Sequence, residues 1–287
     1  MIETLRDFDQ NLALLNLNEA ARDEVRDFVL RNWKRVASLS AQAYQGEIPD
    51  YAICRLKPLS RLAVWVWKLS EVSQKYLALG VPEAVFSDTA ADISLRQRLY
   101  YEKTGKPGLS RGDCIWFRHL ENAQIFKVGV LQFQPFEMLY LEKKADGSGW
   151  FSISDRQKAS LPAGSRVVNV HIQKGTDIDP EKVAESFALA RRLFTKLYPE
   201  VSFNAFVCYS WLLHPGLIEL LPEHSRILKF AEFFEIIGVS GDREQAIERI
   251  FGKRFRSRAH FPQETSLQKA ALARMDLLGY AIGVVRW

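Results

Sequence analysis

Apolar residues recur every three or four positions through the first hundred residues, which is the period of an amphipathic helix. One apolar stripe runs through residues 18–39 and a second through residues 59–79, where Gly80 closes the pattern. A third helix is expected over about 82–103, closed by Gly105. No strand pattern precedes Gly105, so the first third of the chain is predicted to be helical.

The pattern changes in the next part of the chain. Residues 123–144 are rich in β-branched and aromatic side chains with apolar alternate positions, and Pro135 interrupts them at an edge, bulge or bend. The glycine-rich stretch 145–149 predicts a turn, and residues 150–154 predict the returning strand. Three or four antiparallel strands are therefore expected before the next helix.

A strand followed by a strongly amphipathic helix comes next. In the strand 165–172, Val168 and Val170 point to one face and Asn169 and His171 to the other. The helix begins at Pro180, with Asp179 as its N-cap. Its apolar stripe consists of Val183, Phe187, Ala190, Phe194 and Leu197.

The remaining segments alternate between strand and helix patterns. A buried strand is predicted over 203–209 and a last strand over 280–287. Parts of residues 225–240 fit the period of a helix and other parts that of a strand, so this stretch is left undecided. The order predicts an α+β protein of two domains, a helical N-terminal domain over 1–110 and a mixed-sheet domain over 111–287. The loop 105–111 marks the boundary between them.

Composition and charge exclude several classes of protein. Hydrophobic residues make up 47% and charged residues 25% of the 287 residues, which is typical of a globular protein. No apolar run is long enough to cross a bilayer and no signal pattern opens the chain, so a cytoplasmic protein is expected. The three cysteines are widely spaced and the histidines scattered, so neither disulfides nor a metal site are predicted. The net charge of +5 includes one basic run at 253–258, which is more typical of a solvated loop than of a nucleic-acid surface.

Six stretches carry a family resemblance. The chain resembles bacterial acyltransferase-domain proteins in which an N-acyltransferase N-terminal domain precedes a GNAT-like, that is N-acetyltransferase-like, C-terminal domain. The matching stretches, in order, are LGVPEAVFSDTAADI (79–93), FKVGVLQFQP (126–135), VVNVHIQKG (167–175), ESFALARRLF (185–194), CYSWLLHPGL (208–217) and LPEHSRILKF (221–230). Two positions depart from the family pattern: Tyr209 stands where a histidine is usual, and His214 where an aspartate is usual.

The resemblance implies a fold and an activity. The implied fold is α+β, a helical N-terminal domain followed by a GNAT-like mixed-sheet acyltransferase domain. The implied activity is acyl-CoA-dependent N-acyl transfer, directly from the thioester to an amine acceptor and without a metal. In such a sheet the strands before and after the central helix part, here 167–172 and 203–209, and the thioester lies between them.

The loop before the central helix is the expected phosphate site. Free backbone N–H groups at a helix start attract anions, and the residues expected to face acyl-CoA are Ile172, Gln173, Lys174, Gly175 and Thr176. The superfamily's spaced-glycine signature is absent from QKGTDIDPE. In the alternative interpretation, the carboxylates of Asp177 and Asp179 accept hydrogen bonds from these backbone N–H groups, and no phosphate binds there.

Four side chains are candidates for the chemistry. His171 has the right type for a general base, although lone strand histidines are more often structural. Cys208 is a buried small residue or, with a base nearby, a nucleophile. Tyr209 or Ser210 could donate to the departing thiolate. Two rival functions stay open: a non-catalytic GNAT-like binding module, and a transferase or hydrolase that depends on Cys208 and His171.

Overall fold

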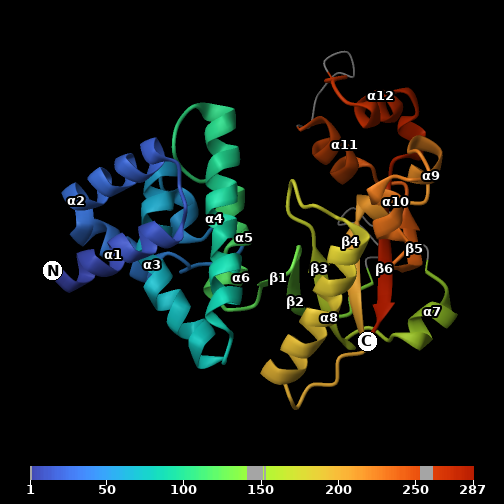
Figure 1. The fold of residues 1–287 in the computed structure, drawn as a ribbon, viewed down its shortest axis with the longest axis horizontal. Coiled ribbons are helices and arrows are strands. Elements are labelled where there is room, and N and C mark those ends of the chain that lie inside the picture. Colours follow the sequence, from blue (N-terminus) through green and yellow to red (C-terminus); the bar gives the residue numbers. More distant parts are fainter. Residues whose placement is uncertain (1, 141–150, 152, 253–260) are drawn as a thin grey trace. The chain divides into compact units, whose positions relative to one another are not determined.

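The computed structural model describes residues 2–140, 151, 153–252 and 261–287. The chain divides into two compact units, Met1–Lys127 and Val128–Trp287. Figure 1 shows the helices of the first unit and the sheet with its helices in the second. The predicted turn at 145–149 and the basic run at 253–258 lie outside the described residues.

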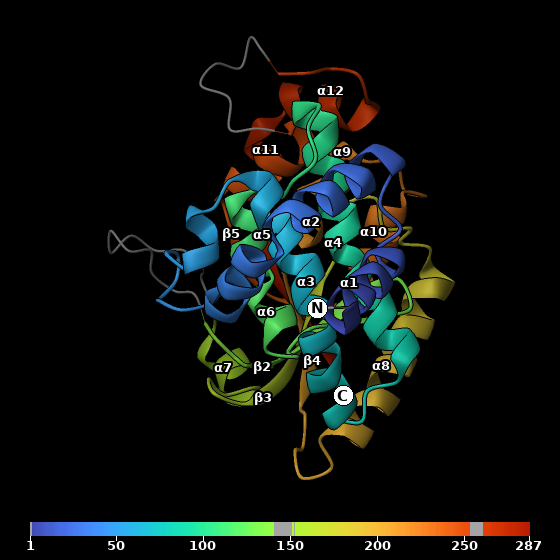
Figure 2. The ribbon, with the colours of Figure 1, turned by 90° about the vertical axis from the view of Figure 1, so that its left-hand side faces the viewer.

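The first unit is helical up to Glu121, as the sequence predicts, and the short strand β1 begins only at its end, at Phe126. Its elements are α1 (Ile2–Leu14), α2 (Glu19–Gln42), the 3₁₀ helix η1 (Ala52–Arg55), α3 (Pro58–Ala78), α4 (Glu83–Thr104), α5 (Arg111–Trp116) and α6 (Arg118–Glu121). The helix α3 packs against α1, α2 and α4 (Figure 2). The three helices expected at 18–39, 59–79 and 82–103 are confirmed as α2, α3 and α4.

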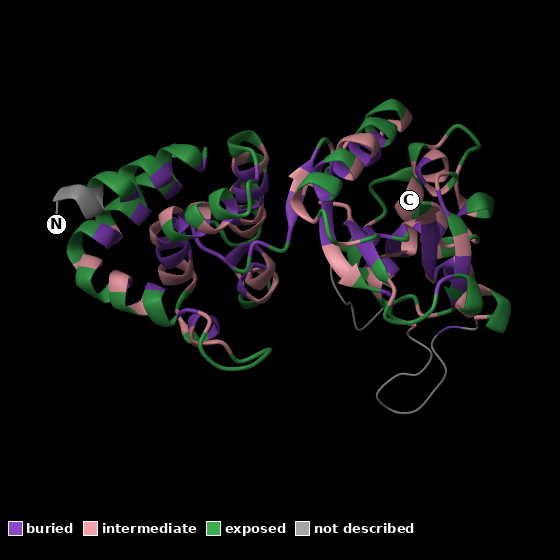
Figure 3. Ribbon diagram, turned by 90° about the horizontal axis from the view of Figure 1, so that it is seen from below, coloured by how far each residue is buried: buried purple, intermediate pink, exposed green. Residues whose placement is uncertain are grey.

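The helix ends follow from local chemistry. Asn18 caps α2 by accepting a hydrogen bond from the backbone N–H of Ala21 at 2.8 Å. Gly105 ends α4 in the left-handed conformation, at φ 66°. Burial then holds the unit together, because Trp65 and Tyr76 on α3 are almost fully enclosed. Figure 3 marks the buried residues of the chain in purple.

The division between the units falls between Lys127 and Val128, later than the loop 105–111 in which the sequence places the boundary. Hydrogen bonds explain this difference. The Tyr44 hydroxyl donates to the backbone oxygen of Cys114 at 2.8 Å, and Arg61 donates to that of Leu109 at 3.2 Å. The residues after the loop are therefore tied to the helices before it.

The second unit is built on a six-stranded mixed sheet of order β1-β2-β3-β4-β6-β5. The strands are β1 (Phe126–Val128), β2 (Leu131–Glu137), β3 (Arg166–His171), β4 (Ala205–Ser210), β5 (Glu235–Ser240) and β6 (Tyr280–Arg286). Strands β3 and β4 run parallel, whereas the pairs β2–β3, β4–β6 and β5–β6 are antiparallel. This sheet confirms the predicted α+β class.

The helices of the second unit include the predicted central helix. They are α7 (Asp155–Ser160), α8 (Pro180–Leu197), η2 (Trp211–Leu213), α9 (Leu217–Leu220), α10 (Arg226–Ala231), α11 (Glu244–Phe251), α12 (Ser266–Ala273) and η4 (Met275–Leu277). The ambiguous stretch 225–240 contains α10 followed by β5, which is why both periods fit it.

The returning strand predicted at 150–154 is not borne out by the described part of that stretch. Phe151 and Ile153 lie in no strand, and the next element is the helix α7. Ser154 and Gln157 form a capping box there, which turns the chain into a helix. The Phe151 side chain instead packs in an apolar cluster with Met138 and Ile237.

The two faces of the sheet are covered differently. On one face lies α8, whose Phe187 packs edge-on against Phe133 and Phe206 with ring centroids 5.9 and 4.9 Å apart. The other face carries an apolar cluster of buried residues: Met138, Phe151, Leu161, Val167, Ala205, Val207, Ile237, Ile282 and Val284. We call these the α8 face and the cluster face.

Candidate active site

Strands β3 and β4 pair over only half their length. Their register joins Val167 to Ala205, Val168 to Phe206 and Asn169 to Val207, and goes no further. Val170 and His171 at the end of β3 therefore have no partner on β4, and neither do residues 208–210 at the end of β4. The two central strands part at their carboxyl ends, as the sequence analysis expects.

Each parted strand stays attached to its outer neighbour. His171 is paired with Gln132 of β2, and Ser210 with Ala281 of β6. The opening is therefore held from both sides by antiparallel ladders, so it belongs to the sheet and does not come from a frayed end.

His171 lies at the parting on the cluster face. Its Nε2 atom is 2.9 Å from Oε1 of Gln134 on β2, and the ring is half-buried. Because a carbonyl oxygen can only accept, Nε2 donates, and in the neutral ring the basic lone pair lies on Nδ1. This bond fixes the orientation of the ring.

Tyr209 lies on the same face as His171, across the parting. Its hydroxyl donates to the backbone oxygen of Leu139 at 2.6 Å, and Tyr280 donates to the backbone oxygen of Tyr209 at 3.0 Å. Burial raises the pKa of Tyr209 to about 12. The phenol is therefore neutral at physiological pH and acts as a hydrogen-bond donor.

Cys208 and Ser210 point to the α8 face, opposite His171. Cys208 is fully buried, and burial raises the pKa of its thiol well above the ordinary range. The Ser210 hydroxyl accepts a hydrogen bond from the backbone N–H of Leu212 at 3.1 Å and so caps η2. The structure therefore places His171 and Tyr209 on one face of the sheet, across the parting from each other, and Cys208 and Ser210 on the other face.

The loop between β3 and α8 makes a tight turn. Gln173 closes it by accepting hydrogen bonds through its backbone oxygen from the backbone N–H of Thr176 at 3.2 Å and from the Thr176 hydroxyl at 2.8 Å. Gly175 takes φ +81°, which favours glycine. Lys174 and Gly175 are exposed, and Ile172 is half-buried. Lys174 therefore extends into solvent from the turn that precedes the helix.

The two acids of this loop have different roles. Asp179 caps α8 by accepting a hydrogen bond from the backbone N–H of Glu181 at 3.1 Å, as expected. Asp177 instead bonds Lys182 and Arg226, both at 2.6 Å. The hydrogen bond from Lys182 lowers the pKa of Asp177. Its negative charge is thus offset by two cations, which removes most of the repulsion that an anion would meet here.

Comparisons with known proteins identify the domain family. Residues 125–284 match the model of the GNAT-like C-terminal domain, and residues 2–121 match the N-acyltransferase N-terminal domain. The chain belongs to the GNAT-like C-terminal domain family. No curated protein sequence matches it.

Solved structures share the fold of the whole chain. An acyltransferase in complex with decanoyl-CoA and teicoplanin is 19% identical, with a TM-score of 0.70 over 96% of this chain and 86% of that one. A mutant acyltransferase in complex with octanoyl-CoA is also 19% identical, with a TM-score of 0.71 over 98% and 88% of the two chains. At this level of identity the likeness establishes the common fold.

The His214 departure has a structural explanation in the GNAT-like domain. Nδ1 of His214 accepts a hydrogen bond from the backbone N–H of Gly216 at 3.2 Å, and burial lowers the pKa of the ring. A side chain at Gly279 would overlap this imidazole. His214 therefore fixes the turn after η2 and is not part of the group around His171 and Tyr209.

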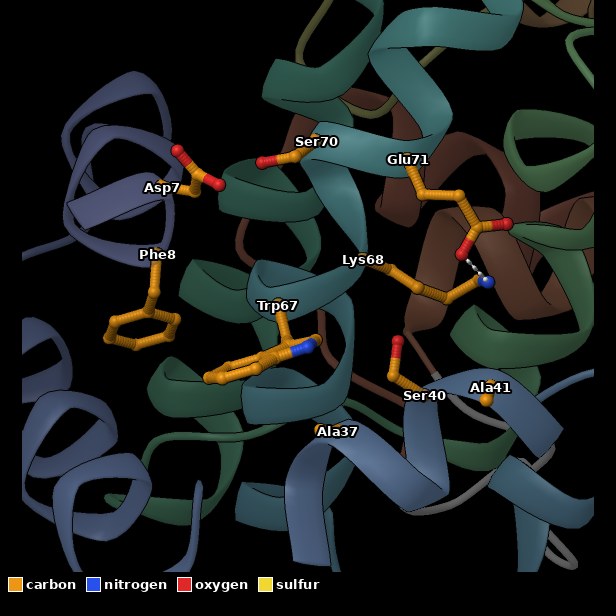
Figure 4. A pocket seen from close by; sticks show the side chains of 9 residues that line it. All are labelled: Asp7, Phe8, Ala37, Ser40, Ala41, Trp67, Lys68, Ser70 and Glu71. Atoms are coloured by element: carbon orange, nitrogen blue, oxygen red, sulfur yellow. Dashed lines mark hydrogen bonds and ion pairs between the residues drawn. The ribbon is translucent and has the colours of Figure 1, made fainter. Parts of the chain in front are cut away.

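The first unit contains a hollow of a different kind (Figure 4). Phe8, Trp67 and Lys68 are among the residues that line it. The Lys68 ammonium is 3.0 Å from a carboxylate oxygen of Glu71 and 3.1 Å from one of Glu121. Since the buried cation already has two carboxylate partners, we assign it a structural role.

Within residues 2–140, 151, 153–252 and 261–287, no group of three or more His, Cys, Asp or Glu side chains is placed to hold a metal ion. None of the helices in this part of the chain is long and apolar enough to cross a membrane.

Sequence reasoning missed several residues of this site. Gln134 contacts His171, and Arg226 with Lys182 offsets Asp177. The glutamines of the stretch LQFQ carry a usable signal, because their spacing of two places them on one face of the strand. Arg226 has no such signal, since its partner lies 49 positions away in the chain.

Proposed function

We propose that this chain transfers an acyl group from acyl-CoA directly to an amine acceptor. The observation that carries the proposal is the parting of β3 and β4 beside His171. An extended pantetheine chain can bind to the unpaired backbone groups of such strands, with its thioester at the parting. The solved acyltransferases with the same fold contain CoA or acyl-CoA, which supports this choice of donor.

The phosphates of the donor are proposed to bind at the start of α8. Helix N-termini favour anions because several backbone N–H groups and the positive end of the helix dipole converge there. At this helix start Pro180 has no N–H and Asp179 accepts a hydrogen bond from that of Glu181, so the phosphates are proposed to use the backbone donors of the preceding turn. Asp177 is already offset by Lys182 and Arg226. Residues 172–176 then face the pyrophosphate, with Lys174 supplying a mobile positive charge.

The transfer step follows from the groups at the parting. The amine nitrogen bonds to the thioester carbonyl carbon, the carbon–sulfur bond breaks, and the nitrogen gives its proton to Nδ1 of His171. Tyr209 stabilises the departing thiolate by exchanging its hydrogen bond with Leu139 for one to sulfur. Because the pKa of Tyr209, about 12, exceeds that of a thiol, the proton that the thiolate finally takes comes from the His171 imidazolium.

The burial of Cys208 argues against the rival thiol mechanism. A nucleophilic cysteine needs an accessible thiolate and a base beside it, whereas Cys208 is fully buried on the face opposite His171. The direct transfer requires no cysteine nucleophile.

Calorimetric titration with octanoyl-CoA, followed by a thiol-release assay with added amines, tests the proposed function. Binding with amine-dependent release of CoA supports it. Binding without release, whichever amine is added, identifies a non-catalytic binding module. Absence of binding at millimolar octanoyl-CoA rejects both the donor and the site.

A further inference from the structure

A row of uncharged polar side chains crosses β2 and β3 beside the proposed base. The register places Gln132 opposite His171 and Gln134 opposite Asn169, so all four side chains point to the same face. This is the cluster face, since Val167, two positions before Asn169, belongs to its apolar cluster. Gln132, Gln134 and Asn169 are 2%, 7% and 8% exposed.

Diagonal neighbours in this group of four differ in their hydrogen bonding. His171 and Gln134 are hydrogen-bonded at 2.9 Å. Gln132 and Asn169, the other diagonal pair, are not. Nε2 of Gln132 and Oδ1 of Asn169 are both buried, and neither has a hydrogen-bond partner.

The fold itself gives no reason for these two carboxamides. A buried donor or acceptor without a partner costs the full free energy of removing it from water, whereas an apolar side chain of similar shape costs nothing of this kind. The neighbouring positions of the same face, Val167 and Val207, show that apolar side chains are accommodated there. An unpaired donor and an unpaired acceptor beside a candidate base are the arrangement expected of a ligand site.

We propose that Gln132 and Asn169 bind the acceptor through an uncharged group that both accepts and donates a hydrogen bond. Nε2 of Gln132 donates to an oxygen of this group, and Oδ1 of Asn169 accepts from its N–H or O–H. Neither residue is charged, so a neutral hydroxyl or carboxamide next to the reacting amine is selected over a carboxylate or a second cation. This inference rests on the proposed acyl transfer and assigns the class of its acceptor.

The test compares three amines in the thiol-release assay with octanoyl-CoA: ethanolamine, glycinamide and ethylamine. Ethanolamine carries a hydroxyl and glycinamide a carboxamide, whereas ethylamine has neither. The readout is the ratio of kcat/KM for each functionalised amine to that for ethylamine. Comparing this ratio between variants cancels the different basicities of the amines.

The substitutions Q132M and N169L are expected to lower at least one of the two ratios about tenfold, the effect of losing one or two hydrogen bonds to the acceptor. The affinity for octanoyl-CoA, measured by calorimetry, is expected to stay within about twofold, and the melting temperature is expected to be unchanged or higher. A lower ratio for ethanolamine indicates that the site binds a hydroxyl, and a lower ratio for glycinamide indicates that it binds a carboxamide. Should one of the two variants fail to fold, the other carries the test, because each removes one of the two proposed hydrogen bonds.

A matched control is available on α4. Gln97 is 1% exposed and its Nε2 also lacks a partner, so Q97M removes an equivalent buried group from the first unit. Its two ratios are expected to equal those of the wild type. If wild-type protein turns over octanoyl-CoA but both ratios survive Q132M and N169L unchanged, the acceptor assignment is wrong and the proposed function stands. If wild-type protein neither binds nor turns over octanoyl-CoA, the proposed function fails and this inference fails with it.

Discussion

Nη1 of Arg226, at the start of α10, lies 2.6 Å from Oδ1 of Asp177 in the loop before α8. Lys182 contacts the other carboxylate oxygen at the same distance. The acid that is unfavourable to phosphate in the sequence therefore has two cationic partners in the fold. We call Asp177, Lys182 and Arg226 the three-residue cluster at the start of α8.

Removing the acid of this cluster is expected to strengthen donor binding. In D177N the two cations lose their counter-charge, and the Kd for CoA is expected to fall about two- to threefold at low salt, the effect of one solvent-screened charge. R226A is expected to raise the Kd by a similar factor or more. Isothermal titration at two ionic strengths measures both changes, which should shrink as salt is added.

The variant D276N is the control for this charge effect. Asp276 is an exposed acid of the same unit that pairs with Arg274 at 2.9 Å. If D276N alters CoA affinity as much as D177N does, the effect is one of overall charge, and the pyrophosphate does not bind beside Asp177.

His171 is expected to control turnover but not donor binding. Loss of a positioned general base lowers rates about 10²- to 10⁴-fold, so H171A should lower kcat in the thiol-release assay by that range while its Kd for octanoyl-CoA stays within about twofold. H224A, which removes an exposed histidine of the same unit, is expected to behave as the wild type. Turnover by H171A at the wild-type rate would exclude it as the base.

Gln134 is expected to act only through His171. Q134L removes the oxygen that holds the His171 ring, so kcat should fall, by less than in H171A. In the H171A background the same substitution should have no further effect, because the group that Gln134 positions is already gone. Independent losses that multiply in the double variant would show that Gln134 has a structural role instead.

The cysteines of the folded protein are expected to be inert. Cys54, Cys114 and Cys208 are all buried, and burial raises the pKa of each thiol. Iodoacetamide at pH 8 should modify none of them before unfolding and all three in guanidinium, as read by peptide mass mapping. C208A should retain activity; modification of native Cys208 with parallel loss of turnover would revive the thiol mechanism.

Because of His119 on α6, we expect the stability of the first unit to fall in acid. Burial, with a smaller contribution from Arg118, lowers the pKa of His119 from 6.5 to about 4. Between these two values the unfolded chain binds a proton that the folded chain does not, so stability is complete above pH 6.5 and falls as the pH drops towards 4. The loss is at most about 3 kcal/mol.

Urea unfolding followed by tryptophan fluorescence at pH 7 and pH 4.5 measures this loss. H119Q is expected to show a smaller drop in the free energy of unfolding than the wild type, because one proton uptake is removed. The exposed-site variant H224Q should drop as far as the wild type does. Equal drops in H119Q and the wild type would show that other groups cause the acid sensitivity.

Local patterns determined much of this protein. The apolar stripes with their caps at Asn18 and Asp179 and the stop at Gly105 specify where the long helices begin or end, because helix ends depend on neighbours in sequence. The alternation of polar and apolar residues along β3 likewise placed Asn169 and His171 on one face of the strand and Val168 and Val170 on the other. The motif order was enough to indicate the GNAT-like family.

Only the tertiary structure decided the site. Whether β3 and β4 part, and that Gln134 reaches His171, depend on strand pairing between segments far apart in the chain. The same holds for Asp177, an anion in the sequence whose charge Arg226 offsets after α8 and α10 come together. Strand register and long-range ion pairs are set by packing of the whole unit, and no local sequence pattern contains this information. The chemical roles of single residues could therefore be assigned only from the folded structure.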